Sequence, residues 1–189
     1  MEKKRHEGRP VIWSPQPRQA AFMARTEDEA LYGGAAGGGK SDALIIEALR
    51  QVHIPHYRAL ILRKTYPSHC WIFPSGAKIY FGSLNHTQDK YNYQGKAFDF
   101  IGVDELTHFT WDEYSYVMSR NRPSGPGTRV YIRATANPGG VGHGWVKARF
   151  ISPAPAGTRM VQLVKVKAPE GKEITRRRTR IFIPSTVFD

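Results

Sequence analysis

The chain has 189 residues, enough for one sizeable hydrophobic core but too few for two full-sized domains. Hydrophobic residues make up 40% and charged residues 23%, as in ordinary globular proteins, which excludes a disordered tail and a fibrous repeat. No apolar run approaches a membrane span, and the charged start, Met1 to Pro10, lacks the apolar stretch of a signal peptide, so we expect a cytoplasmic protein. The single cysteine, Cys70, excludes an intramolecular disulfide, and we expect it to be a small buried side chain.

Charge is the clearest signal in the composition. Lys and Arg number 28 against 16 Asp and Glu, which gives a formal net charge of +12. Between Val141 and Arg180 there are ten basic residues and only two acids, Glu170 and Glu173. Because such a surplus attracts polyanions, we place contacts to a phosphate backbone in this stretch. The alternative is a basic face that only solvates the surface.

Glycine and proline divide the chain into short segments in which strand and helix patterns alternate, which predicts an α/β fold with a mainly parallel sheet. A helix is expected from Pro15 or Pro17, with Ser14 as its cap. A short apolar strand, 30–32, then runs into glycines, and 41–53 carries apolar residues at helical spacing. This segment is therefore predicted to be a strand, then a glycine loop, then a helix.

The middle of the chain continues the alternation. The almost wholly apolar segment 57–62 is typical of a strand buried on both faces. Segments 71–73 and 77–81 flank Pro74-Ser75-Gly76, which predicts a β-hairpin. The remaining expected elements are a strand at 98–103, a helix at 110–120, a strand at 129–134, a loop at 135–144, and strands at 160–166 and 180–183.

The most specific motif lies between the first strand and its helix: Gly34-Ala35-Ala36-Gly37-Gly38-Gly39-Lys40-Ser41 fits G-x-x-x-x-G-K-[ST]. Glycines such as Gly34, Gly37, Gly38 and Gly39 let a backbone curl round phosphates, with N–H groups pointing inward and a helix dipole behind them. Lys40 would reach the β and γ phosphates of ATP, and the Ser41 hydroxyl would bind Mg²⁺. The alternative is a glycine-rich turn with a solvated lysine.

A phosphate loop needs carboxylates for the metal and the attacking water. Asp104 and Glu105 end the apolar strand 98–103, as a Walker B site requires. We assign metal binding to Asp104 and polarisation of water to Glu105. Without the loop upstream, an Asp-Glu pair would be an ordinary strand terminus.

Two further polar positions are candidates. Thr135 and Asn137 follow the strand 129–134 and can hydrogen-bond to phosphate or water without adding charge, although Asn-Pro-Gly is also an ordinary turn sequence. Gln19 has an amide that can pair with an adenine edge, but one glutamine on a helix is commonly only solvated.

Taken together, an ordered set of motifs resembles the N-terminal ATPase domain of the large terminase subunit of tailed bacteriophages. The set is Pro17-Arg18-Gln19, the loop 33–41, Leu62-Arg63-Lys64-Thr65-Tyr66-Pro67, Phe73-Pro74-Ser75-Gly76, 99–105, 134–140 and Gly144-Trp145-Val146-Lys147. The resemblance implies a P-loop ATPase of the additional-strand class over 13–189, preceded by a basic N-terminal arm, 1–12.

The family drives double-stranded DNA into a preformed capsid, and the resemblance implies ATP and Mg²⁺ as cofactors. It implies partners as well: double-stranded DNA, a small terminase subunit, a portal protein and further copies of the chain in a ring. The implied roles are adenine contact by Gln19, phosphate binding by the loop with Lys40, metal binding by Ser41 and Asp104, catalysis by Glu105, and coupling of hydrolysis to movement by Thr135, Ala136 and Asn137.

Three departures from the family stand out. Only Ser68 to Cys70 separate Pro67 from Trp71, where relatives have a helical segment, so part of the sheet's helical cover should be missing. Few carboxylates follow Glu113, so we expect no nuclease activity from this chain. The loop also lacks an arginine for the transition state, which leaves as candidates Arg63, Arg120 and Arg122.

The prediction is therefore an ATP-hydrolysing packaging-motor domain. The alternatives are a degenerate prophage remnant that binds nucleotide or DNA without productive turnover, and a fragment of a helicase-like ATPase. A second motor domain, which a helicase would need, does not fit the length.

Overall fold

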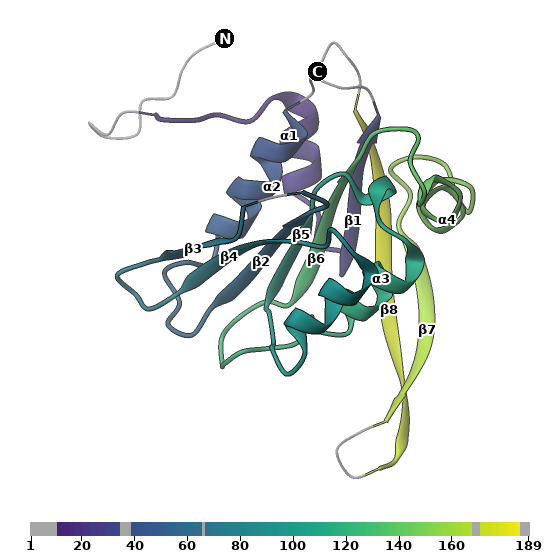
Figure 1. Ribbon diagram of the computed structural model, residues 1–189. Helices are drawn as coiled ribbons and strands as arrows, with labels where there is room; N and C mark the ends of the chain where they lie inside the picture. Colours follow the sequence, from purple (N-terminus) through teal and green to yellow (C-terminus); the bar gives the residue numbers. More distant parts are fainter. Residues whose placement is uncertain (1–10, 35–38, 66, 168–170, 186–189) are drawn as a thin grey trace.

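The computed structural model describes residues 11–34, 39–65, 67–167 and 171–185. Eight strands form one sheet in the order β3-β4-β2-β5-β6-β1-β8-β7 (Figure 1). The six central strands are parallel, and β3 and β7 add antiparallel edges, which confirms the predicted mainly parallel sheet with its hairpin. The strands are β1 (Glu29–Gly34), β2 (Arg58–Arg63), β3 (His69–Ile72), β4 (Lys78–Ser83), β5 (Phe100–Val103), β6 (Tyr131–Ala136), β7 (Met160–Lys167) and β8 (Glu173–Ser185).

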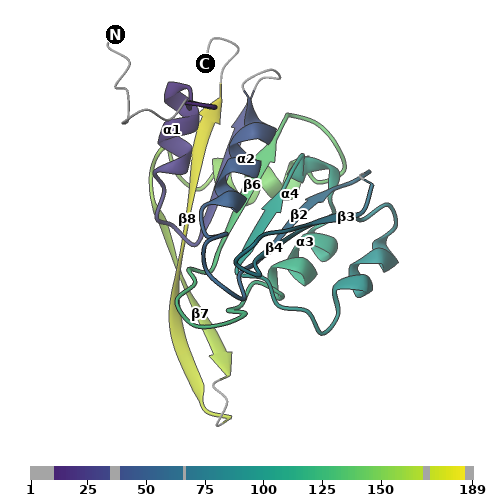
Figure 2. The ribbon, with the colours of Figure 1, turned by 90° about the vertical axis from the view of Figure 1, so that its left-hand side faces the viewer.

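Helices cover both faces of the sheet, because its central strands are apolar on both sides. α1 (Pro17–Met23) and α2 (Lys40–Leu49) lie on one face, and α3 (Trp111–Met118) and α4 (His143–Val146) lie on the other (Figure 2). Alternation along β1 illustrates the division: Tyr32 packs with Phe22 of α1, whereas Leu31 belongs to the core that contains Val117 of α3 and Val146 of α4. The sheet is therefore the middle one of three layers, with helices packed on each face.

Most predicted elements are confirmed, with shifted ends. α1 begins at Pro17, but the residue before it, Gln16, takes the cap position in place of Ser14. α2 ends at Leu49 and β6 continues to Ala136, into the expected loop. The sequence analysis missed four short helical segments: α4, the 3-10 helices η1 (Thr87–Tyr93) and η2 (Leu106–His108), and the π-helix η3 (Lys147–Ile151). None of the described helices is long and apolar enough to cross a membrane.

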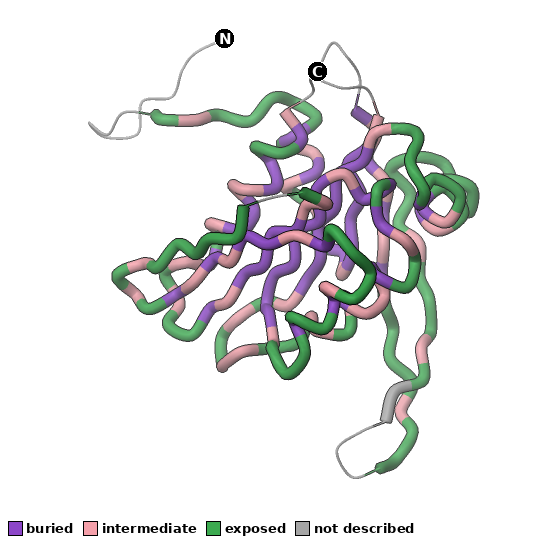
Figure 3. Tube along the Cα trace, in the orientation of Figure 1, coloured by how far each residue is buried: buried purple, intermediate pink, exposed green. Residues whose placement is uncertain are grey.

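The prediction for Cys70 is wrong, because its thiol is exposed on β3. All four residues of this edge strand are exposed, and the Ile72 side chain is 70% exposed (Figure 3). β3 pairs only with β4 and comes directly after the short connection from Pro67. This open edge agrees with the expected loss of helical cover.

Candidate functional site

A pocket of about 330 Å³ opens where the carboxyl ends of β1, β5 and β6 meet the start of α2. In an open parallel sheet this edge is where ligands bind. The pocket is lined by Gly39, Lys40, Ser41, Asp42, Asp104, Glu105, Thr135, Ala136 and Asn137. The structure therefore brings together most of the predicted site residues; Gly37 and Gly38 lie outside the described residues.

The ends of the glycine loop show why glycine is required there. Gly34 has a φ of 143°, and a Cβ on it would lie 2.0 Å from the Ser185 carbonyl oxygen of the neighbouring strand. Gly39 has a φ of 58°, and a Cβ on it would lie 2.3 Å from the Gln19 amide nitrogen. α2 begins directly after Gly39, and its first residues, Lys40 to Asp42, line the pocket, where the first turn of a helix has backbone N–H groups available to an anion.

Lys40, Ser41 and Asp104 form the base of the pocket. Lys40 is only 8% exposed, and burial lowers the pKa of its ammonium while nearby Asp104 opposes that shift. The Ser41 hydroxyl donates to one Asp104 carboxylate oxygen at 2.9 Å, and the Thr135 hydroxyl donates to the other. Hydroxyl and carboxylate oxygens are ligands that Mg²⁺ prefers, so this pair fits the ion.

Glu105 is held by Arg63 and His108. Arg63, at the end of β2, approaches its two carboxylate oxygens at 3.0 and 3.3 Å, and the His108 ring lies 3.3 Å from one of them. Hydrogen bonding to Arg63 lowers the pKa of the Glu105 carboxyl. Glu105 also adopts a left-handed backbone (φ 57°), and its N–H donates to the Thr135 hydroxyl at 3.1 Å. Thr135 thus joins the two adjacent carboxylate residues.

Asn137 contributes an acceptor without a partner. Its backbone carbonyl accepts a hydrogen bond from the Thr107 hydroxyl at 2.9 Å, which fixes this part of the loop after β6. Its side-chain oxygen Oδ1 is buried and has no hydrogen-bond partner in the described protein. Because an unpaired buried acceptor is costly, the pocket suits a ligand or water that donates here.

Gln19 braces the loop. Its side chain is buried, its amide nitrogen donates to the Gly39 carbonyl at 2.8 Å, and its amide oxygen accepts from the Gln16 N–H at 2.8 Å. The structure thus places the amide against the loop, and the expected adenine contact stays a prediction.

Of the three candidate arginines, only Arg63 lies in reach of the site. Arg120 lies over the Tyr116 ring, and Arg122 donates to the Lys96 carbonyl. Sequence reasoning missed His108 and Asp42. His108 follows Glu105 by three residues, a helical spacing that could have indicated their contact. Asp42 lies in the first turn of α2 and lines the pocket.

Residues 58–149 match the protein-family model described as terminase large subunit, T4likevirus-type, N-terminal. The match covers 92 of the 189 residues, from the start of β2 into η3, and makes the chain similar to the terminase large-subunit family over that segment. The matched segment contains Arg63, Asp104, Glu105 and Asn137, and the glycine loop precedes it. No curated protein matches the sequence.

Solved structures of large terminases share the fold. The ATPase domain of the large terminase of Thermus phage P74-26, in an arginine-to-alanine variant, is 14% identical, with a TM-score of 0.61 over 94% of this chain and 83% of that domain. The large terminase of a second thermophilic bacteriophage is 12% identical, with a TM-score of 0.62 over 94% of this chain and 47% of its own. The chain therefore spans about half the length of that terminase. These likenesses show that the chain has the fold of large-terminase ATPase domains, which agrees with the resemblance found in the sequence.

Proposed function

We propose that the pocket binds and hydrolyses ATP with Mg²⁺ and that the chain couples this reaction to movement of double-stranded DNA. The observation that carries the proposal is a continuous set of hydrogen bonds. It runs from Ser41 on α2 through Asp104 and Thr135 to the backbone of Glu105. Through these bonds, a movement of Ser41 at the start of α2 would shift Asp104 and Glu105, which follow β5, and Thr135 at the end of β6.

The positive and negative groups of the pocket would have different roles. Lys40, Gly34, Gly39 and the rest of the loop would bind phosphate oxygens, and Ser41 with Asp104 would hold the metal. Mg²⁺, when bound, neutralises charge on the β- and γ-phosphate oxygens. The buried ammonium of Lys40 adds a positive charge in a place that water screens poorly.

Glu105 would orient the attacking water. Its lowered pKa keeps the carboxylate ionised at neutral pH, so it accepts a hydrogen bond from water. Arg63 donates hydrogen bonds to the same carboxylate, and its guanidinium also lies near Asp104, with 3.8 Å between Arg63 Nε and Asp104 Oδ2. Asn137 Oδ1, the orphan acceptor, would bind a second donor at the γ-phosphate end.

The wider role follows from the family. We propose that the chain acts in the bacterial cytoplasm with a small terminase subunit, a portal protein and further copies of itself in a ring. Residues 13–189 would form the ATPase domain, and we expect no nuclease activity from these residues.

The test is steady-state ATP hydrolysis with Mg²⁺, with and without linear duplex DNA. Lys40→Ala and Glu105→Gln should each remove turnover, the latter by about 10²- to 10⁴-fold, because general-base groups contribute that much. Asp42→Asn is the matched control: it removes a carboxylate from the same pocket but outside the hydrogen-bonded set. If the wild type binds nucleotide yet turns over no faster than Glu105→Gln, the chain is a remnant without turnover and the proposal fails.

A further inference from the structure

A two-stranded ribbon leaves the sheet at the end opposite the pocket. β1 pairs with β8 only over Arg180 to Ser185, so residues 173–179 of β8 pair with β7 alone. Ser185 lies beside Gly34 at the start of the glycine loop, which places the other end of β8 away from the pocket. At about 3.3 Å per residue these seven residues extend about 20 Å beyond the sheet (Figure 1).

The surface of the chain is more positive than its net charge suggests, because several of its acidic side chains are buried. Six described acids are buried with internal partners or in the pocket: Glu27, Glu29, Glu47, Asp99, Asp104 and Glu113. Asp99, for example, accepts hydrogen bonds from the Arg58 and Ser124 backbone N–H groups and from the Thr128 hydroxyl. Such carboxylates neutralise little of the exposed positive charge.

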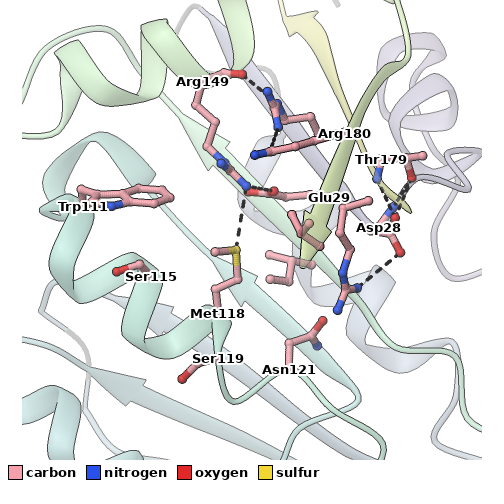
Figure 4. A pocket seen from close by; sticks show the side chains of 14 residues that line it. Asp28, Glu29, Trp111, Ser115, Met118, Ser119, Asn121, Arg149, Thr179 and Arg180 are labelled. Carbon is pink, nitrogen blue, oxygen red and sulfur yellow. Dashed lines mark hydrogen bonds and ion pairs between the residues drawn. The ribbon is translucent and has the colours of Figure 1, made fainter. Parts of the chain in front are cut away.

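The fold uses some of the basic residues between Val141 and Arg180. Around the cavity of about 370 Å³ between α3 and the base of the ribbon, Arg149 pairs with Glu29 at 2.6 Å (Figure 4). In the same region Arg180 donates to the Arg149 carbonyl, and Arg178 lies 3.5 Å from Asp28. These arginines have partners and are not free for a ligand.

Farther out on the ribbon the basic side chains are exposed and have few acids near them. They are Lys165, Lys172, Arg176 and Arg177. Neither the Arg176 nor the Arg177 side chain forms an ion pair or hydrogen bond with any described residue. Among the described residues of the outer ribbon the only exposed acid is Glu173, which lies 3.9 Å from Lys165. Exposed arginines without acids are available to an external anion.

The two arginines point to opposite faces of the ribbon. Arg176 stands opposite Val164 and Arg177 opposite Leu163, and consecutive strand residues alternate between faces. A two-stranded ribbon is narrow enough to enter the major groove of duplex DNA, where phosphates line both walls. A ribbon with cations on both faces matches that arrangement of charge.

We propose that the outer β7–β8 ribbon binds the phosphate backbone of duplex DNA through Arg176 and Arg177, with Lys165 and Lys172 beside them. The inference rests on the proposed function, because the DNA is what the motor would move. Contacts to phosphates hold DNA independently of base sequence, which suits a translocating protein. Exposed Val161 lies opposite Thr179, nearer the base of the ribbon, and exposed Leu163 lies directly opposite Arg177, so binding of a protein partner to this face is the competing outcome of the test.

The experiment is fluorescence anisotropy of a labelled 30-base-pair duplex with the full chain, without nucleotide, over a series of salt concentrations. Each phosphate contact adds about 0.9 to the slope of log affinity against log salt. Arg176→Ala with Arg177→Ala should therefore reduce the slope by about 2, equally for two duplexes of unrelated sequence. Arg176→Lys with Arg177→Lys should retain it.

The matched control compares single charges. Lys147→Ala removes one exposed lysine near α4, away from the ribbon, and should change the slope much less than Arg177→Ala. Equal effects of the two substitutions, or an unchanged slope in the double alanine variant, would overturn the proposal and leave the ribbon as a surface for a protein partner. ATP hydrolysis without DNA separates the two proposals, because ribbon variants should leave it unchanged, whereas Glu105→Gln should abolish it and spare DNA binding.

Discussion

Two arginines of the sheet, one on the central strand β6 and one on the ribbon, differ in what surrounds them. Arg133 on β6 is fully buried beneath α2, where it donates to the Glu27 and Arg25 carbonyls and lies 3.7 Å from the Glu47 carboxylate. Arg177 on the ribbon is exposed and has no described partner. The same side chain thus holds strands and helix together in one place and stays available for binding in the other. Burial, more than residue type, decides which of the two roles an arginine has.

The largest expected effect is on stability, when the buried arginine is replaced. Arg133→Met should lower the free energy of unfolding by about 3–5 kcal/mol, because it removes the buried cation beside Glu47 Oε2 and the donors of the Glu27 and Arg25 carbonyls. Glu47 then keeps only Arg50, which is half-exposed and pairs with its other oxygen. Burial lowers the pKa of Arg133 only to about 10, so the guanidinium is charged at neutral pH. Arg177→Met should change the same quantity by less than about 0.5 kcal/mol. Urea denaturation of both variants measures the difference, and equal losses would contradict the comparison.

A smaller effect is expected from Thr135→Val inside the pocket. The substitution keeps the shape but leaves an Asp104 oxygen and the Glu105 N–H without their shared hydroxyl. We expect a loss of about 1–3 kcal/mol in unfolding free energy, together with slower ATP turnover. Thr135→Ser should restore both. If turnover stays at the wild-type rate in the valine variant, the hydroxyl does not join the two carboxylates in function.

The Arg63–Glu105 pair should give a pH-dependent effect of about 0.2–1 kcal/mol, because its side chains are partly exposed. Arg63 holds the pKa of Glu105 below the ordinary 4.5, so the pair stabilises the fold above that pH. The contribution is lost as pH falls through the lowered pKa. Melting temperatures of the wild type and Arg63→Gln should therefore differ at pH 7 and converge in acid. A difference that grows in acid would have the wrong sign.

The smallest effect concerns the open edge at β3. Native protein should react with a thiol reagent at Cys70 at a rate close to that of a free cysteine, because the thiol is exposed. Cys70→Ser should leave the melting temperature unchanged, since the side chain fills no core space. Protection of the thiol in the native protein, released by denaturant, would instead indicate that the edge is covered.

Local patterns predicted much of this protein. Periodicity located most helices and the buried strands, and the motif Gly34 to Ser41 with Asp104 and Glu105 located the pocket. They succeed because apolar alternation and glycine conformations are properties of neighbouring residues. The error at Cys70 shows the limit, because an apolar pattern cannot tell an uncovered edge strand from a buried one.

The sequence by itself determined the strand and helix order, the phosphate loop and the surplus of positive charge. Only the tertiary structure decided which polar groups face each other: Arg63 against Glu105, Gln19 against the Gly39 carbonyl, and Arg149 against Glu29, pairs separated by 20 to 120 residues. Such contacts depend on strand order and register, which no local pattern contains. For the same reason the sequence showed a basic stretch, whereas the fold showed that its inner arginines have partners and that the Arg176 and Arg177 side chains have none among the described residues.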